Sequence, residues 1–231
     1  MTDYHPGLEG VIATESSISD INGEKGILSY RGYSIEELAE KSTFEETAFL
    51  LLTGELPTPD ELIKFTEQIN ARRDLPSGMI DLLKTLPKES NPMDVIQLAV
   101  SSLGTFYPIT FDAEDLKAKK YTKDYYIEVS AGILGSIGSI VAAWNRIKNN
   151  KDYIRPDSNL SYADNFMHML DDSIEVTPLI SRIIDATLIL HAEHTINAST
   201  FTSMVTSSTL ASPTQVIASA IGSLSGPLHG G

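Results

Sequence analysis

Signals for the start of a helix recur along this chain and restrict its fold more than any other feature. In three places a serine or threonine stands three residues before a glutamate, so that the hydroxyl can accept a backbone N–H while the carboxylate returns the bond. In four places, one of which is Thr58 again, a threonine, asparagine or serine precedes a proline, which tolerates the first helical position well. We therefore expect a mainly helical, all-α fold, with helix starts marked by Ser34, Thr43, Thr58, Pro59, Pro92, Pro178 and Pro213.

Several of the expected helices are apolar on nearly every side, as in the stretch from Val95 to Phe106. Such a helix needs other helices on both sides, so the fold should have more than two layers. Gly132, Gly135 and Gly138 recur at helical spacing and leave one helix face without side chains. That face can admit a helix of the same chain or one of a second subunit. We expect it, with the small residues from Ala218 to Gly226, to contribute to a dimer interface.

Only the first thirty or so residues favour strands. Val11 to Thr14 and Gly26 to Tyr30 flank Asp20 to Gly23, which is typical of a turn. We expect a small N-terminal β element here. Further along, the polar segment from Asn145 to Asn159 predicts an exposed turn, and the small residues from Ser199 to Thr214 predict a buried helix. We find no internal repeat and no domain boundary.

The composition excludes several classes of function. The 231 residues carry 31 acidic and 17 basic side chains, a formal net charge of -14, which repels nucleic-acid phosphates and anionic membranes. The absence of cysteine excludes disulfides, thiol catalysis and cysteine-bound zinc. No apolar run reaches the roughly 20 residues of a membrane span, and the N-terminus resembles neither a secretion signal nor a transit peptide. We expect no nucleic-acid or membrane partner and a cytoplasmic location.

Four of the five histidines lie in the last third of the chain. His168 falls on a mostly apolar stretch, and we assign it no role. His191 and His194 stand three residues apart at the end of the helix that begins at Pro178, so their side chains can share a face. Three interpretations stay open: a structural pair at the helix end, part of a binding pocket, or a zinc site. The zinc site would need more ligands than two histidines.

The fourth of these histidines, His229, lies in the sequence Gly-Pro-Leu-His-Gly-Gly at residues 226–231. The glycines on both sides leave the backbone open to close approach by a ligand. A neutral imidazole there could donate a hydrogen bond to an oxygen that gains charge during enolisation. His229 is therefore our candidate catalytic residue, and His194 would share its pocket.

Five short motifs follow one another through the chain. They are Gly-Leu-Glu-Gly at 7–10, Gly-Ile-Leu-Ser-Tyr-Arg-Gly-Tyr at 26–33, Leu-Leu-Thr-Gly-Glu-Leu-Pro-Thr at 51–58, His-Ala-Glu-His at 191–194 with Asn-Ala-Ser at 197–199, and Gly-Pro-Leu-His-Gly at 226–230. In this order the five resemble the citrate synthase family, which also contains 2-methylcitrate synthases. The resemblance runs from end to end of the chain.

The resemblance implies a predominantly helical, dimer-forming acyltransferase. Such an enzyme condenses acetyl-CoA with oxaloacetate and water to give citrate and CoA, the first reaction of the tricarboxylic acid cycle. It implies that His229 stabilises the enol and that His194 binds oxaloacetate. It implies no cofactor and no metal, since acetyl-CoA is a substrate. Arg31 lies where the family can use an arginine toward the CoA phosphates, although a single arginine in Tyr-Arg-Gly is too little to assign it a site.

The resemblance also implies a continuation, because family members carry a small domain of roughly 100 residues after the His-Gly-Gly segment and then complete the large domain. Residues 1–231 would then be a truncated large-domain portion. We expect this chain alone to be inactive, because the family's catalytic aspartate, second histidine and most arginines belong to that continuation. Two alternatives remain: a 2-methylcitrate synthase that uses propionyl-CoA, and a noncatalytic oligomerisation module.

Overall fold

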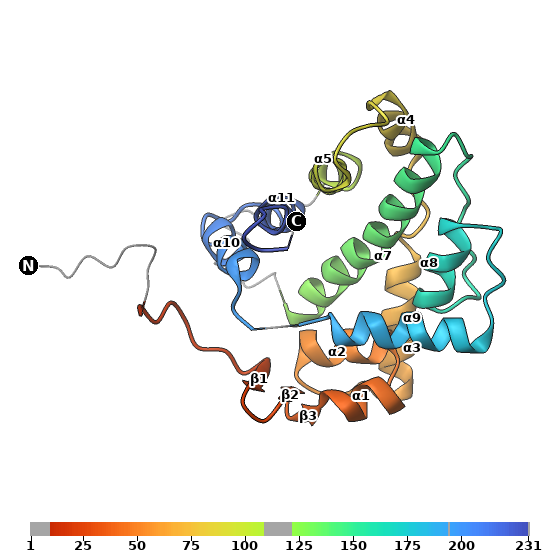
Figure 1. The fold of residues 1–231 in the computed structure, drawn as a ribbon. Helices are drawn as coiled ribbons and strands as arrows, with labels where there is room; N and C mark the ends of the chain where they lie inside the picture. Colours follow the sequence, from red (N-terminus) through yellow and green to blue (C-terminus); the bar gives the residue numbers. More distant parts are fainter. Residues whose placement is uncertain (1–9, 109–121, 194, 231) are drawn as a thin grey trace, which may run out of the picture.

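The computed structural model describes residues 10–108, 122–193 and 195–230. In these residues ten helices follow a small three-stranded sheet (Figure 1), so the expected mainly helical fold with a small N-terminal β element is confirmed. The strands are β1 (Ser19–Asn22), β2 (Ile27–Tyr30) and β3 (Tyr33–Ser34). The helices are α1 (Ile35–Lys41), α2 (Phe44–Thr53), α3 (Pro59–Asn70), α4 (Ser77–Thr85), α5 (Pro92–Phe106), α7 (Lys123–Lys148), α8 (Tyr162–Leu170), α9 (Pro178–Leu190), α10 (Ala198–Ser207) and α11 (Pro213–Leu224).

The predicted helix starts are confirmed, because the capping groups lie where the sequence places them. Thr43 and Thr58 each form a complete capping box with the glutamate three residues later. Ser34 accepts the backbone N–H of Glu37 at the start of α1. The four prolines are the first residues of α3, α5, α9 and α11, where a missing N–H costs no helical hydrogen bond.

The first strand differs from the prediction. The sheet is antiparallel in the order β1-β2-β3, and Ser19–Asn22 pairs with β2. The predicted strand from Val11 to Thr14 has no strand partner among the described residues, whereas most of the predicted turn is itself strand. The actual turn occupies residues 23–26, which close the hairpin between the two paired strands.

The centre of the fold is α7, the long green helix that crosses Figure 1 diagonally. It packs against α3, α5 and α8. Ile140 and Trp144 join one buried cluster with α4 and α5, while Ala131 joins a second cluster with α1, α2 and α9. By length and composition α7 is the one helix of the described ranges that could cross a membrane, yet half of its most apolar window is buried in the fold. Its position in the core explains its apolar surface.

The glycine face of α7 is filled by helices of the same chain. A methyl group on Gly135 would collide with the carbonyl oxygen of Ile69 at the end of α3, and Gly138 lies against the Tyr162 side chain of α8. The internal-packing alternative is therefore confirmed. Gly135 and Gly138 thus face α3 and α8 of the same chain, and a contribution of α7 to a dimer interface stays a prediction.

Helices α10 and α11 pair as a hairpin whose α11 packs on α5; Figure 1 shows the hairpin, in blue, beside α5. Gly222 of α11 lies against the Gln97 side chain of α5, and Ala218 is 4% exposed. This face of α11, which was also assigned to a dimer interface, packs within the chain. The predicted buried helix from Ser199 is a helix, but none of the residues of α10 is buried.

The polar segment after α7 begins later than predicted and is partly buried. α7 continues through Lys148, and Arg146 within it is 5% exposed. Its guanidinium bonds the Asp172 carboxylate at 3.0 Å and also donates to the carbonyl of Asp152. The expectation of an exposed turn from Asn145 is therefore wrong at its first residues, where a paired charge is buried.

Candidate active site

His229 lies in a tight turn that follows α11. The backbone N–H groups of His229 and Gly230 both donate to the carbonyl oxygen of Gly226, at 2.9 and 3.3 Å. These bonds close the turn and leave the His229 side chain half-buried. Because α10 and α11 form a hairpin, the turn after α11 lies beside the start of α10.

The His229 ring faces the first turn of α10. Its Nε2 atom lies 2.8 Å from the hydroxyl of Ser199 and 3.3 Å from the backbone nitrogen of the same residue. A backbone N–H can only donate, so Nε2 is an acceptor and the hydrogen-bond network assigns the ring proton to Nδ1. The partial positive charge at the N-terminus of α10 also favours an acceptor at this point.

This arrangement gives the imidazole a defined chemical capacity. With Nε2 occupied by Ser199, the donor of the ring is Nδ1–H, which can stabilise an oxygen that gains negative charge. The Ser199 oxygen also lies 2.9 Å from the Ala220 carbonyl of α11, and its single proton goes to one of these two acceptors at a time. The candidate catalytic residue is thus oriented by the helix pair that carries it.

Ser199 is a functional contact that sequence reasoning missed, although it belongs to one of the five motifs. A signal was present. Asn197 caps α10, so Ser199 is the second helical residue, and the N–H at this position has no partner within a helix. Such an N–H needs an acceptor from elsewhere in the chain, which is the role that His229 fills.

His194 lies outside the described residues, so its predicted substrate-binding role stays a prediction. His191 is the C-cap residue of α9, is exposed, and its Nδ1 lies 2.8 Å from the Thr187 carbonyl. The structural interpretation is therefore confirmed for His191. In the described part of the chain no three histidine, aspartate or glutamate side chains gather to hold a metal.

The backbone directly after position 194 is unusual. Thr195 has a φ of +74°, the left-handed conformation, which costs a β-branched residue about 1–2 kcal/mol. Its N–H donates to Oε1 of Glu193 at 2.8 Å, and its carbonyl accepts the N–H of Asn197 at 3.0 Å. A strained residue of this kind persists only where its surroundings hold it, and it often marks a functional turn.

Arg31 is engaged by the protein itself. Its Nη2 donates to the Leu51 carbonyl at 2.9 Å, near the end of α2, and its Nη1 donates to the Ser17 hydroxyl at 3.0 Å. Arg31 and Gly32 have φ values of +50° and +91°, the paired left-handed conformations of a tight hairpin turn. These contacts give Arg31 an anchoring role in the hairpin.

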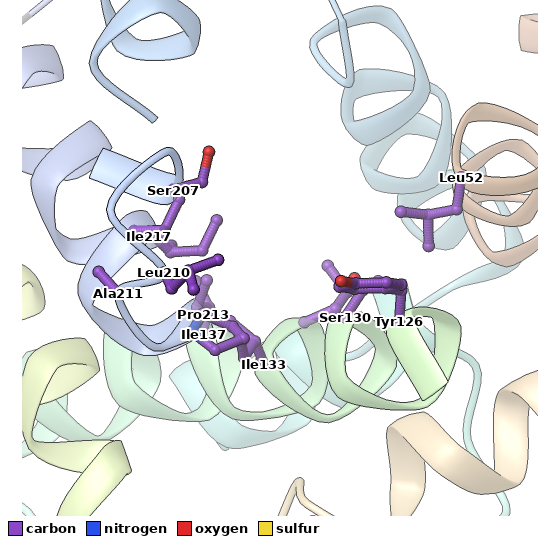
Figure 2. A pocket seen from close by; sticks show the side chains of 12 residues that line it. Leu52, Tyr126, Ser130, Ile133, Ile137, Ser207, Leu210, Ala211, Pro213 and Ile217 are labelled. Atoms are coloured by element: carbon purple, nitrogen blue, oxygen red, sulfur yellow. The ribbon is translucent and has the colours of Figure 1, made fainter. Parts of the chain in front are cut away.

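A separate apolar cavity of about 440 Å³ lies over α7. In Figure 2, Ile133 and Ile137 of α7 lie at its base, and Leu52 of α2 lies across from the loop that joins α10 to α11. No charged side chain and no histidine lines it, so it offers shape and apolar contact without acid–base chemistry. The lining residues are Leu52, Tyr126, Ser130, Ile133, Leu134, Ile137, Ser207, Leu210, Ala211, Pro213, Val216 and Ile217.

Comparisons with known proteins agree along the whole chain. Residues 7–231 match the profile of a family described as "Citrate synthase, C-terminal domain". The citrate synthase of Acidithiobacillus ferridurans is 45% identical over 99% of this chain and 58% of that protein. A Corynebacterium glutamicum protein named 2-methylcitrate synthase 2 is 40% identical over 100% of this chain and 59% of that protein. The solved citrate synthase from Pyrobaculum aerophilum superimposes with a TM-score of 0.88 at 39% identity, covering 98% of this chain and 56% of that one. The chain thus spans less than two thirds of the length of these relatives.

Proposed function

Since this chain belongs to the citrate synthase family, we propose that it serves the condensation of acetyl-CoA with oxaloacetate. The acetyl methyl carbon loses a proton and attacks the ketone carbon of oxaloacetate, whose oxygen becomes a hydroxyl. Water then cleaves the thioester, so that citrate and CoA leave. This reaction is the first step of the tricarboxylic acid cycle.

The observation that carries the proposal is the contact between Ser199 and His229 Nε2. We assign to His229 the stabilisation of the enol: its Nδ1–H donates to the thioester oxygen as the methyl proton leaves. A donor aimed at a developing charge contributes most when it is held in place before the reaction. The N-terminus of α10 holds this ring in that way.

We assign oxaloacetate binding to His194. The support is its place in the motif His-Ala-Glu-His, between Glu193 and Thr195, which are joined by a hydrogen bond. A histidine there would donate to an oxygen of oxaloacetate and polarise the ketone for attack. Its partner in catalysis is His229, 35 residues later.

The condensation also needs a base, because a hydrogen-bond donor cannot remove the methyl proton. We assign no residue of 1–231 to that role, and we propose that these residues are the large-domain portion of the enzyme. A polypeptide limited to them would not carry out the condensation. The greater length of the relatives supports this assignment.

We propose a cytoplasmic homodimer without a resident cofactor or metal. The thioester itself supplies the activation, and no electrons are transferred to or from the substrates. The net charge of -14 argues against nucleic acid and anionic membranes as partners. The partners are therefore oxaloacetate, acetyl-CoA and a second copy of the chain.

A 2-methylcitrate synthase that uses propionyl-CoA is the second candidate. The observation that favours it is the 40% identity to a relative that bears this name, not far below the 45% to a citrate synthase. The two activities share their chemistry and differ by one methylene of the acyl chain. A noncatalytic oligomerisation module is the alternative of another class.

The test is release of CoA that depends on oxaloacetate. The protein expressed from its complete reading frame should turn over acetyl-CoA faster than propionyl-CoA, and His229→Gln should lower kcat by about 10²–10³. Preference for propionyl-CoA would select the second candidate. If the complete protein releases no CoA in the presence of oxaloacetate, the noncatalytic module is the remaining candidate. A chain of 231 residues, with both ends verified by mass spectrometry, should be inactive; robust activity would place the base within residues 1–231.

A further inference from the structure

Tyr30, in the N-terminal sheet, bonds the turn that follows α9. Its side chain is 0% exposed, and its hydroxyl reaches residues about 160 positions later. It donates to the Glu193 carbonyl at 2.9 Å and accepts the Glu193 N–H at 3.3 Å. The carbonyl of Ile189, in the last turn of α9, lies 3.2 Å from the same oxygen.

These contacts hold the chain just after the end of α9. The Ile189 carbonyl already accepts the N–H of Ala192 at 3.2 Å, so the single proton of the Tyr30 hydroxyl goes to the Glu193 carbonyl. The same atom holds Glu193 by both of its backbone groups, so the chain leaves α9 in one direction. Burial raises the pKa of the Tyr30 hydroxyl, which keeps it protonated and able to donate at neutral pH.

The turn that Tyr30 holds is under strain. Glu193 receives the Tyr30 contacts, and its carboxylate accepts the N–H of Thr195, whose φ is +74°. A β-branched residue stays in this conformation only where neighbouring contacts fix it. The contacts on Glu193 are therefore part of what keeps Thr195, and with it the start of α10, in place.

Tyr30 is itself firmly supported. The next residue, Arg31, donates to the Leu51 carbonyl and to Ser17, which ties the hairpin turn to α2. Tyr30 also packs among buried side chains of α1, α2 and α9. Because Tyr30 is held in this way, its hydroxyl has a fixed position and can hold the residues to which it is hydrogen-bonded.

We infer that Tyr30 is a positioning residue for oxaloacetate binding: its hydroxyl fixes the backbone of Glu193, the residue directly before position 194. The inference rests on the proposed function, in which His194 binds oxaloacetate. It assigns the N-terminal sheet a role in the active site, since the hydroxyl that orders the turn comes from β2. Tyr30 would act through the turn and would not touch the substrate.

The test compares Tyr30→Phe with Tyr33→Phe in the protein expressed from its complete reading frame. Both variants remove one hydroxyl from the same hairpin, but in the described residues Tyr33 has no hydrogen bond from its hydroxyl. Calorimetry with oxaloacetate alone gives the dissociation constant. Steady-state kinetics give kcat and both KM values, and hydrogen exchange with mass spectrometry reports on the backbone of residues 189–199 and of α7.

Tyr30→Phe should weaken oxaloacetate binding about tenfold, as expected for the loss of a buried hydrogen bond, while KM for acetyl-CoA stays within about twofold. Exchange should rise in residues 189–199 and stay unchanged in α7. Tyr33→Phe should match the wild type. Weaker binding of oxaloacetate with an unchanged KM for acetyl-CoA is the result that distinguishes a positioning role from a general loss of structure.

Three results would overturn the inference. They are an unchanged oxaloacetate affinity, an equal loss for both substrates, and a rise in exchange that extends through α7, which would make Tyr30 a general core residue. Failure of the proposed function is separate: the wild type would then bind no oxaloacetate and release no CoA. Wild-type activity with an unaffected Tyr30→Phe variant would reject the inference alone.

Discussion

The Ser199 hydroxyl lies 2.8 Å from Nε2 of His229, although thirty residues separate them in the chain. Ser199 is in the first turn of α10 and His229 is in the turn after α11, so the helical hairpin brings them together. The same hydroxyl reaches the Ala220 carbonyl at 2.9 Å. One side chain therefore couples the packing of the hairpin to the orientation of the candidate catalytic ring.

Ser199→Ala should lower kcat with little effect on substrate binding. The variant keeps the backbone N–H on Nε2 and loses the hydroxyl, whose net contribution of about 1 kcal/mol corresponds to a roughly fivefold slower reaction. Steady-state kinetics on the complete protein measure this. Ser207→Ala, later in the same helix, is the matched control and should leave kcat unchanged. An unaltered kcat in Ser199→Ala would show that the backbone N–H alone orients His229.

His194→Ala and His191→Ala should separate the two histidines of the motif. His191 is exposed at the end of α9 and bonds only a carbonyl of its own helix among the contacts described, so its loss should change oxaloacetate KM by less than about twofold. His194→Ala should raise that KM or lower turnover at least about tenfold, with the circular dichroism spectrum unchanged. The reverse pattern would transfer substrate binding to His191.

Gly135→Ala should destabilise the fold although alanine is the better helix former. The added methyl group meets the Ile69 carbonyl oxygen, which belongs to the backbone. Overpacking of about 3 kcal/mol should outweigh the gain of about 1 kcal/mol in helix propensity, for a net loss of about 2 kcal/mol in the free energy of unfolding measured in urea.

Gly132→Ala, one turn earlier in α7, is the matched control. Its methyl group would approach Cγ of Arg72 at 3.1 Å, and that side chain is exposed and can move. The free energy of unfolding should change by less than about 1 kcal/mol. Equal losses for the two variants would contradict the explanation from backbone contact.

Glu45 should make the stability of the protein depend on pH. Its side chain is 6% exposed, and its Oε1 accepts the Tyr162 N–H at 2.7 Å. Burial raises the pKa of the Glu45 carboxyl above the ordinary 4.5, and the nearby Asp185 raises that pKa further. The hydrogen bond from Tyr162 and the charge of Arg73 lower the pKa, but burial has the larger effect. The folded state then holds the proton more tightly than the unfolded state. The stability from this group is present below the ordinary pKa and is lost as pH rises through the raised value.

Glu45→Gln keeps the hydrogen-bond acceptor and removes the charge. The variant should therefore be more stable than the wild type near pH 7, and the two should converge as the pH falls toward about 4. Urea denaturation at several pH values measures the difference. Glu36→Gln, an exposed residue of α1, is the control and should show no such trend. A wild type that is the more stable protein at neutral pH would show that the electrostatic attraction of Arg73 for the Glu45 carboxylate dominates.

Local chemistry was sufficient to locate the starts of six of the ten helices in the described residues. A capping oxygen and the N–H that it accepts lie within three residues, as in Thr43 and Thr58, and proline acts on its own position. Such signals do not depend on the rest of the fold, so the starts of α1, α2, α3, α5, α9 and α11 could be read directly. The same holds for His229, which the motif singled out before any geometry was known.

Other features depend on contacts between distant parts of the chain, which no local pattern contains. The sequence favoured Val11 to Thr14 as the partner of β2, whereas Ser19–Asn22 pairs with it in the structure. The glycines of α7 predicted that another helix packs closely against it. Only the folded structure shows that these helices are α3 and α8. The contacts of Ser199 with His229 and of Tyr30 with Glu193 join residues 30 and 163 positions apart. Backbone groups left unpaired at helix ends can form hydrogen bonds with any suitable side chain. Only the packed fold determines which side chain lies close enough to do so.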